Sequence, residues 1–302
     1  MDSPSDPKRA LITGIGGFTG RYVRRALQAE GYAVYGTTHV DDVPETRVHP
    51  VDLRDQSELQ KVVADIAPSV VVHLAAVAFV AHGNADEIYE VNLVGSRHLL
   101  ESLANLQSRP RAVILASSAN VYGNADVSVL DESVPPNPQN DYAVSKLAME
   151  HMARIWCDRL PIVVARPFNY TGVGQPSHFL LPKIVDHFRR REPVIELGNM
   201  DVERDFSDVR TVAAIYTALV RKPPVGRILN VCSGKTVSLR QVLATMGEIA
   251  GYQIEPRVNP AFVRRNEVQR LRGDPSALET AIGPWESIPI RQTLKWMYEQ
   301  SD

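Results

Sequence analysis

Short apolar runs alternate with longer amphipathic segments along the first half of the chain. Apolar runs of strand length occur at residues 9–13, 33–37, 69–74, 112–117 and 162–166. Segments such as residues 21–30 and 57–66 carry apolar residues at the spacing of a helix with one buried face. Strands that alternate with helices favour right-handed crossovers and a parallel sheet. We therefore predict an α/β fold with a doubly wound, Rossmann-type parallel sheet.

The pattern changes after Arg166, where glycine- and proline-rich loops precede a predicted helix at residues 180–190. Residues 208–231 return to the helix-then-strand pattern, and we expect this strand to rejoin the main sheet. The chain should thus form a large sheet domain and a smaller, discontinuous C-terminal lobe. The expected bounds are residues 1–168 with 208–232 for the domain, and residues 169–207 with 233–302 for the lobe.

The composition is that of an ordinary water-soluble protein: of 302 residues, 44% are apolar and 23% charged, with a net charge of -2. So small a charge favours neither nucleic acid nor a membrane surface as a partner. No apolar run approaches the roughly 18 residues of a membrane span, and the N-terminal residues lack a secretory apolar stretch, so we expect a cytoplasmic protein. Cys157 and Cys232 lack metal-site spacing and are expected to be core residues, with no metal bound.

The first predicted strand runs into a glycine cluster, TGIGGFTG, at residues 13–20. Gly14, Gly17 and Gly20 would let the backbone approach a pyrophosphate, whose charge is stabilised by amide groups at a helix N-terminus. A tight turn can also collect glycines, but the position between a strand and a helix favours a dinucleotide site. We therefore expect residues 1–168 to bind a dinucleotide and the smaller lobe to bind the substrate.

The end of the second predicted strand bears on the choice of cofactor. An NAD-binding fold carries an acidic residue here, which binds the adenosine ribose. This chain has Thr38 and His39 instead. Because a carboxylate would repel a 2′-phosphate, its absence permits NADP(H). Asp41 or Asp42 could reach back to the ribose, so NAD(H) stays open as a second cofactor.

Tyr142 and Lys146 lie four residues apart in a helical pattern and so share one helix face. The preceding strand ends in Ser117 and Ser118, at the edge of a parallel sheet where ligands bind. A nearby ammonium group stabilises a phenolate, and a serine hydroxyl can bind the same substrate oxygen. We predict Tyr142 as the general acid, assisted by Lys146 and Ser118. The alternative is that Tyr142 packs in the core and Ser118 merely ends a strand.

Four motifs together resemble the extended short-chain dehydrogenase/reductase family: TGIGGFTG, HLAA at residues 73–76, SSANVYG at 117–123 and YAVSK at 142–146. Their spacing matches, and the resemblance covers nearly the whole chain. It implies that Asn92 supports the site, while His73 is expected to make a structural hydrogen bond. The implied cofactor contacts are Gly14, Gly17, Phe18, Gly20, Thr38, His39, Asp52, Leu53, Leu74, Ala75, Ala76, Tyr142 and Lys146.

Residues 165–175, 202–210 and 264–278 resemble GDP-mannose dehydratases and, more closely, GDP-6-deoxy-D-mannose reductases. The resemblance implies a GDP-linked 6-deoxyhexose as the substrate. The implied substrate contacts are Ser118, Asn120, Asn169, Lys183, Arg204, Arg264 and Glu267. Such cations suit a diphosphate, because a guanidinium group can bind two of its oxygens at once. The alternative is that the arginines of residues 264–272 form a solvated basic face.

Asn120 bears on the reaction type. By the resemblance, sugar 4,6-dehydratases carry a glutamate at this position and GDP-fucose synthases a cysteine. An amide has no useful acid or base pKa, so neither dehydration nor epimerisation beside the carbonyl has its proton carrier here. We expect reduction of GDP-4-dehydro-6-deoxy-D-mannose to GDP-6-deoxy-D-mannose (GDP-D-rhamnose). A nucleotide-sugar 4-epimerase with retained NAD stays open; a GDP-mannose 4,6-dehydratase and a non-catalytic dinucleotide sensor are less favoured.

The resemblance also implies a homodimer, assembled through helices at about residues 92–106 and 142–156. Both segments have apolar faces, and these faces could instead pack on the sheet. The expectation of a dimer therefore rests on the family resemblance and not on the apolar pattern.

Overall fold

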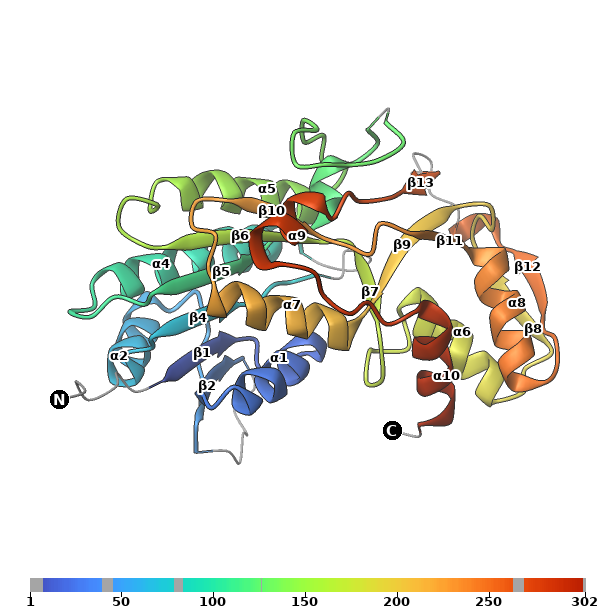
Figure 1. Cartoon of the computed structure of the whole chain (residues 1–302), viewed down its shortest axis with the longest axis horizontal. Helices are drawn as coiled ribbons and strands as arrows, with labels where there is room; N and C mark the ends of the chain where they lie inside the picture. Colours follow the sequence, from blue (N-terminus) through green and yellow to red (C-terminus); the bar gives the residue numbers. More distant parts are fainter. Residues whose placement is uncertain (1–7, 40–45, 79–83, 126, 263–268, 301–302) are drawn as a thin grey trace. The chain divides into compact units, whose positions relative to one another are not determined.

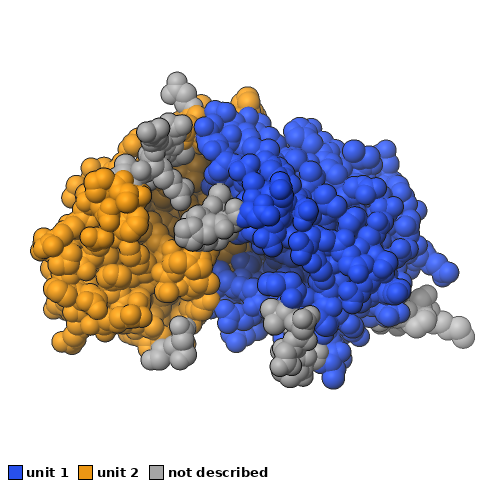
Figure 2. Space-filling view, turned by 180° about the vertical axis from the view of Figure 1, so that it is seen from behind, with its two compact units in different colours: residues 1–121, 136–166, 213–229 blue, residues 122–135, 167–212, 230–302 orange. Residues whose placement is uncertain are grey.

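The computed structural model describes residues 8–39, 46–78, 84–125, 127–262 and 269–300. The chain divides into two compact units, which are coloured separately in Figure 2. Residues 122–135 belong to the second unit, although the sequence pattern placed them in the first domain. The first unit comprises residues 1–121, 136–166 and 213–229, and the second comprises residues 122–135, 167–212 and 230–302.

A sheet of seven strands is present in the described part of the chain, in the order β10-β6-β5-β4-β1-β2-β3. The pairings from β6 across to β3 are parallel, which confirms the predicted α/β fold. β10 lies beside β6, so the strand predicted in residues 208–231 does rejoin the main sheet. The strands are β1 (Arg9–Thr13), β2 (Ala33–Thr38), β3 (Val48–Pro50), β4 (Val70–His73), β5 (Ala112–Ala116), β6 (Ile162–Pro167) and β10 (Ile228–Val231).

Helices cover both faces of this sheet, which is why its central strands are continuous apolar runs. Figure 1 shows α2, α4 and α5 over one face, and α1 and α7 over the other. Leu11, Val71 and Val113 of the strands pack with Leu59 of α2 and Leu99 of α4 in one buried cluster. These helices are α1 (Phe18–Ala29), α2 (Gln56–Ile66), α4 (Ser96–Ala104), α5 (Asp141–Arg154) and α7 (Val209–Arg221).

The order of the strands reverses beside β1. The chain runs outward from β1 to β2 and β3 and then crosses back to β4, on the other side of β1. In open α/β sheets, ligands bind at the carboxyl ends of the strands that flank such a switch point. Here those ends are Thr13, which leads into the glycine loop, and His73, which leads into Leu74–Ala76. The topology therefore brings two of the four sequence motifs together.

The second unit contains smaller sheets and its own core. β9 pairs with β7, β11 and β13, and β12 pairs with β8. Apolar residues of α6, α8 and α10, such as Phe188, Met246 and Leu294, form a separate buried cluster. The strands are β7 (Asn169–Thr171), β8 (Val194–Leu197), β9 (Glu203–Asp208), β11 (Thr236–Ser238), β12 (Glu255–Val258) and β13 (Arg270–Leu271). The helices are α6 (Leu180–Arg189), α8 (Leu239–Ala250), α9 (Ser276–Ile282) and α10 (Ile290–Glu299).

The remaining helical elements of the described residues are short or depart from α-helical geometry. A short α3 (Ala85–Tyr89) continues as a π-helix, η1 (Glu90–Gly95), directly before α4. Short 3₁₀ turns occur at η2 (Ala119–Tyr122) and η3 (Pro260–Phe262). Within the described segments, none of the helices combines the length and apolar character that crossing a bilayer requires.

Candidate active site

The glycine loop connects β1 to α1 through close backbone contacts. The amide of Gly14 donates to the Thr37 carbonyl (2.9 Å), and the amide of Gly17 donates to the Gly14 carbonyl (3.0 Å). Gly14 has φ 70°, and a Cβ at this position would lie 3.0 Å from the backbone of Ala75. A Cβ on Gly20 would lie 2.4 Å from the Gly14 carbonyl oxygen. Glycine is therefore required at both positions, for conformation at the first and for packing at the second.

The loop leaves the start of α1 suited to an anion. Gly17 is the N-cap residue, and within the described structure no side chain caps this end and no acidic residue occupies the first turn. Gly16 and Gly17 are both exposed. The positive end of the helix dipole is thus accessible beside two exposed glycines. The pyrophosphate of a dinucleotide fits this arrangement, and residues 14–20 would hold it.

The residues expected near the adenosine lie at the ends of β2 and β3. Thr38 is the last residue of β2, and its Oγ1 would lie 3.9 Å from a Cβ on Gly16. His39 is exposed. Asp52 accepts hydrogen bonds from Arg54 Nε (2.9 Å) and Nη2 (2.6 Å), and this pairing lowers the pKa of Asp52. An adenine contact at Asp52 would therefore have to share its carboxylate with Arg54. Asp41 and Asp42 lie outside the described residues.

His73 connects the end of β4 to η1 and to β1. Ser96 Oγ donates to the Asn92 carbonyl (2.6 Å), so it accepts a hydrogen bond from His73 Nε2 (2.8 Å). Thr13 Oγ1 accepts from the Ala75 amide (3.3 Å) and donates to His73 Nδ1 (2.6 Å). Burial lowers the pKa of His73 to about 3, which keeps the ring neutral. The structural hydrogen bond predicted for His73 is confirmed, whereas its partner Thr13 was not predicted.

Asn92 joins three elements. Its Oδ1 accepts from the Val77 amide (2.8 Å), and its Nδ2 donates to Ser145 Oγ on α5 (3.0 Å). Ser145 Oγ in turn donates to the carbonyl of Tyr142 (2.8 Å). Asn92 lies in the π-helix η1, and such distortions frequently occur at functional sites. It therefore holds the loop after β4 against the residues that flank Tyr142 and Lys146.

Helix α5 presents Tyr142 and Lys146 on one face. Lys146 is buried, and its Nζ lies 6.0 Å from the centre of the Tyr142 ring. Nζ also donates to the Ala116 carbonyl at the end of β5 (2.9 Å). Ser118 lies two residues after Ala116 and is 8% exposed. Its Oγ accepts a hydrogen bond from the Asn120 backbone amide (3.1 Å). The structure therefore brings Lys146 to both Tyr142 and the strand end that carries Ser118.

Two opposing effects act on the protonation of the Lys146 side chain. Burial lowers the pKa of Lys146 to about 8, while the negative charge of Glu150 acts in the opposite direction. Below about pH 8 the ammonium form therefore prevails, and it places a positive charge beside Tyr142. A phenolate that formed at Tyr142 would be stabilised by this charge.

Glu150 forms a buried cluster that sequence analysis did not identify. Its carboxylate accepts from Ser117 Oγ (2.5 Å), Arg166 Nε (2.9 Å) and Arg166 Nη2 (2.6 Å). Ser117 thus uses its hydroxyl inside the protein, which leaves Ser118 as the serine at this strand end for a substrate. The sequence feature that could have indicated this cluster is Glu150 itself, an acidic residue one helical turn after Lys146 on the same buried face of α5.

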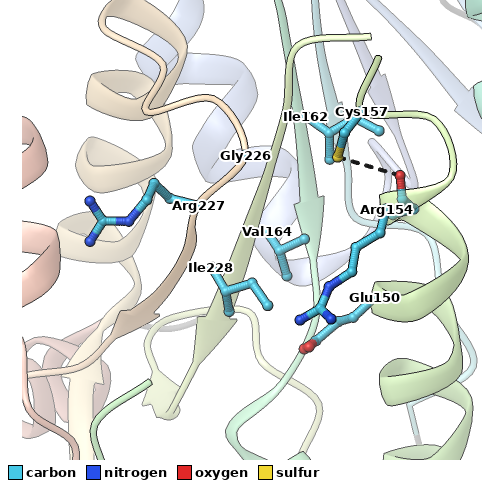
Figure 3. Close-up of a pocket in the computed structure, with 9 residues that line it drawn as sticks. Glu150, Arg154, Cys157, Ile162, Val164, Gly226, Arg227 and Ile228 are labelled. Atoms are coloured by element: carbon cyan, nitrogen blue, oxygen red, sulfur yellow. Dashed lines mark hydrogen bonds between the residues drawn. The ribbon is translucent and has the colours of Figure 1, made fainter. Parts of the chain in front are cut away.

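A pocket of about 60 Å³ lies beside this cluster (Figure 3). In Figure 3 the Arg154 side chain extends towards Glu150, whereas Arg227 points away from the pocket. Cys157 lines the pocket, is partly buried and packs against the core cluster, so it lies at the edge of the core, while Cys232 is buried as predicted. The lining residues are Glu150, Ala153, Arg154, Cys157, Ile162, Val164, Gly226, Arg227 and Ile228.

Two of the residues expected to bind the substrate lie together in the second unit. β7 pairs with β9, and Asn169 Nδ2 donates to the Asp205 carbonyl (3.4 Å), next to Arg204. Lys183 is directed to β8 instead, because its Nζ donates to the Glu196 carbonyl (2.8 Å). Arg264 and Glu267, the remaining two in this half of the chain, lie outside the described residues.

The helices expected at a dimer interface are η1 with α4, and α5. Both contribute to the core beneath them, through residues such as Leu99 and Met149. Both also carry exposed apolar side chains, Val94 on η1 and Val144 on α5. Packing on the sheet therefore accounts for one face of each helix and leaves apolar surface on the other.

A model of the NAD dependent epimerase/dehydratase family matches residues 10–232 of the chain. GDP-6-deoxy-D-talose 4-dehydrogenase from Aggregatibacter actinomycetemcomitans is 35% identical over 293 residues, covering 96% of this chain and 97% of its own. GDP-6-deoxy-D-mannose reductase from Pseudomonas aeruginosa is 32% identical over 299 residues, covering 95% of each chain.

Solved structures match over nearly the same extent. The structure of RMD from Pseudomonas aeruginosa complexed with NADPH gives a TM-score of 0.84 at 31% identity, covering 96% of each chain. A crystal structure from Burkholderia cenocepacia J2315, provisionally described as an epimerase, gives a TM-score of 0.92 at 50% identity and covers 98% of each chain. The likeness is therefore not confined to the seven-stranded sheet.

Proposed function

The chain belongs to the NAD-dependent epimerase/dehydratase family, and on that basis we propose that it is a nucleotide-sugar reductase. Its substrate is GDP-4-dehydro-6-deoxy-D-mannose, and reduction at C4 gives GDP-6-deoxy-D-mannose, also called GDP-D-rhamnose. The names of the two curated relatives support a GDP-6-deoxyhexose and an oxidoreductase reaction. The structure of RMD with NADPH supports NADPH as the cofactor.

The observation that carries the choice of reaction is the residue beside Ser118. Asn120 is the exposed residue of the otherwise buried turn η2, and its backbone amide donates to Ser118 Oγ (3.1 Å). Removal of a proton from C3 or C5 of a 4-keto sugar needs a side chain that can accept one. The carboxamide of Asn120 has no such pKa. A reaction confined to C4 is therefore favoured over dehydration or epimerisation at the neighbouring carbons.

Two residues of the first unit, Tyr142 and Ser118, act on the C4 oxygen in this proposal, and Lys146 acts on Tyr142. Residues 14–20 would hold the pyrophosphate of NADPH, and this cofactor would supply the hydride. Tyr142 donates its phenolic proton to the oxygen as negative charge develops there. Ser118 donates a second hydrogen bond to the same atom. Lys146 stabilises the tyrosinate that remains and donates to the Ala116 carbonyl, which fixes the position of its charge.

The GDP moiety is assigned to cationic and amide groups of the second unit. Arg204 and Arg264 are proposed to bind the diphosphate, because guanidinium groups bind two oxygens at once. Asn169 lies beside Arg204 and is proposed to bind with it. Glu267 is proposed to accept from the ribose or the guanine. Lys183 would have to leave the Glu196 carbonyl to take part.

The assignment is tested by running the reaction in deuterium oxide with NADPH and GDP-4-dehydro-6-deoxy-D-mannose. We expect one NADPH consumed per product, no deuterium at C3 or C5 and the manno configuration at C4. NMR of the product measures all three, because the coupling of H4 to its neighbours reports the C4 configuration. A sample without enzyme corrects for spontaneous exchange beside the carbonyl.

Each contrary outcome of this experiment indicates a different enzyme. A product inverted at C4 would support a talose-forming activity like that named for the Aggregatibacter relative. Turnover without net NADPH consumption, by enzyme that copurifies with its dinucleotide, would support a 4-epimerase. Deuterium at C3 or C5 would contradict the argument from Asn120 and direct attention to His178 as a proton carrier.

The cofactor preference gives a separate prediction. We expect the wild-type protein to use NADPH at least as well as NADH, and Thr38→Asp to shift the preference towards NADH. A new carboxylate at the end of β2 would repel a 2′-phosphate, by roughly 1 kcal/mol at a solvated position, or about fivefold in affinity. Thr38→Asn, which adds the same bulk without charge, is the control. Calorimetric titration with both cofactors measures the change, and a strong wild-type preference for NADH would indicate that Asp41 or Asp42 fills the acidic role.

A further inference from the structure

The buried carboxylate of Glu150 joins the three elements that surround Lys146. Glu150 and Lys146 lie one turn apart on the same face of α5, and both are 2% exposed. Glu150 accepts from Ser117, which follows β5, and from Arg166, which is in β6. The two strand ends are themselves paired, because the Ser117 amide donates to the Ala165 carbonyl (2.7 Å). One carboxylate therefore fixes α5 against the ends of both strands.

Stability alone is a weak reason for such a cluster. Removing a carboxylate and a guanidinium from water carries a large desolvation cost, and apolar side chains of similar volume often stabilise a core equally well. An ion pair in this place therefore suggests a requirement for its charge or its geometry. Lys146 explains why a negative charge is needed here, because it places a positive charge in the same interior one turn earlier on α5.

The charged and titratable groups around Lys146 come from α5, β4 and β6. Tyr142 and Glu150 lie on its own helix, His73 faces it from β4, and Arg166 of β6 is bound to Glu150. Beyond Glu150, the pocket of Figure 3 adds Arg154, Cys157 and Arg227 at its lining. His73 is neutral, because burial depresses its pKa. Glu150 is thus the group in this environment whose charge favours the ammonium form of Lys146.

We propose that Glu150 is a positioning residue of the active site, which acts through Lys146. Its carboxylate, held by Ser117 and Arg166, fixes the end of β5, where the neighbouring Ala116 carbonyl accepts the hydrogen bond from Lys146 Nζ, and it lies one turn of α5 from Lys146 itself. The inference rests on the proposed function for the role of Lys146 in turnover, but the effect on Lys146 itself is independent of the reaction. Glu150 touches neither substrate nor cofactor in this assignment.

The test is a direct titration of Lys146 in Glu150→Gln. Protein labelled with ¹³C at lysine Cε is titrated by NMR, and the Lys146 signal is identified by its absence in Lys146→Met. The carboxamide keeps the shape of the side chain and removes its charge. We expect the Lys146 midpoint to fall by about one pH unit or more, the usual scale for the loss of an adjacent opposite charge. The alkaline limb of the pH profile for reduction should fall by the same amount.

Two further variants serve as controls, one for the loss of a nearby charge and one for the loss of folding. Arg227→Gln removes a charge from the lining of the same pocket, but its side chain points away from Glu150 (Figure 3). It should leave both the titration and the activity unchanged. Glu150→Gln leaves Arg166 as an uncompensated buried charge and could fail to fold, so the double variant Glu150→Gln/Arg166→Gln removes both charges. It should retain more of the wild-type melting temperature and shift Lys146 in the same direction.

The outcomes separate this inference from the proposed function. A Lys146 midpoint unchanged in a folded Glu150→Gln or in the double variant overturns the role of Glu150. A midpoint that falls together with the alkaline limb supports it. If the midpoint falls while the activity profile stays in place, Glu150 does control the charge of Lys146, but turnover does not depend on that charge. That last result would support the inference and contradict the proposed mechanism.

Discussion

Tyr142→Phe should reduce kcat for the reduction by a factor of about 10² to 10⁴, the usual range for the loss of a general acid, while the protein stays folded. This corresponds to roughly 3 to 5 kcal/mol of transition-state stabilisation. The phenyl ring keeps its place on α5 beside Lys146, so the change removes the proton and little else. The KM for the GDP-sugar should change little, because the lost contact strengthens only as charge develops on the oxygen.

Tyr89→Phe is the matched control for this variant. The Tyr89 hydroxyl donates to Asp141 at the start of α5 (2.9 Å), so its removal also deletes a tyrosine hydrogen bond at this helix. It has no part in the proposed proton transfer and should retain nearly full activity. Steady-state kinetics of both variants measure kcat and KM, and their melting temperatures show whether they stay folded. Wild-type turnover in folded Tyr142→Phe would rule out the mechanism and favour a non-catalytic, cofactor-sensing role.

Periodicity accounts for most of the sheet domain. The strands predicted from apolar runs coincide with β1, β2, β4, β5 and β6 to within one or two residues, because a parallel strand buried on both faces is apolar throughout. The start of α1 differs, since it begins at Phe18 rather than Arg21. The glycine loop passes directly into that helix, and apolar spacing carries no information about a turn whose contacts are made by backbone.

The boundary between the two units was harder to predict. Residues 122–135 follow in sequence the strand that leads to Ser118 and were therefore assigned to the first domain. In the structure Tyr122 Oη donates to Asn230 Oδ1 (2.8 Å), and the Leu130 amide donates to the Arg272 carbonyl (2.8 Å). Both partners come from the second unit and lie more than a hundred residues further along the chain. Long-range hydrogen bonds of this kind have no local pattern.

Polar clusters in the core show a similar limit. A helical pattern reveals that Glu150 shares a buried face with Lys146, but it does not reveal the compensating charge. That charge, Arg166, is at the end of a strand that the sequence marked only by its apolar residues. The same holds for His73, whose structural role was predicted while its partner Thr13 was not. Motif spacing locates chemistry along the chain, whereas the partners that tune it come from neighbouring strands.

Lys146→Met should have the largest effect, with kcat reduced by more than about 10³ and weaker cofactor binding. The variant loses the positive charge beside Tyr142 and the donor to the Ala116 carbonyl together. A lost charge-assisted hydrogen bond alone corresponds to about 1.5 to 3 kcal/mol, or roughly ten- to a hundredfold. Steady-state kinetics and calorimetric titration with NADPH measure the two effects. Lys61→Met, an exposed lysine on α2, is the control and should behave as wild type.

Lys146→Arg tests whether turnover depends on a positive charge beside Tyr142 or on the titration of Lys146 itself. The pKa of Lys146 is lowered by burial to about 8, so wild-type activity should fall as the pH rises through that value and the ammonium group loses its proton. Arginine stays protonated throughout this range. The variant should therefore retain a small activity without an alkaline limb near pH 8, because the charge beside Tyr142 persists while the geometry is impaired. Profiles of kcat from pH 6 to 10 measure this, and an unchanged limb in Lys146→Arg would assign the titration to another group.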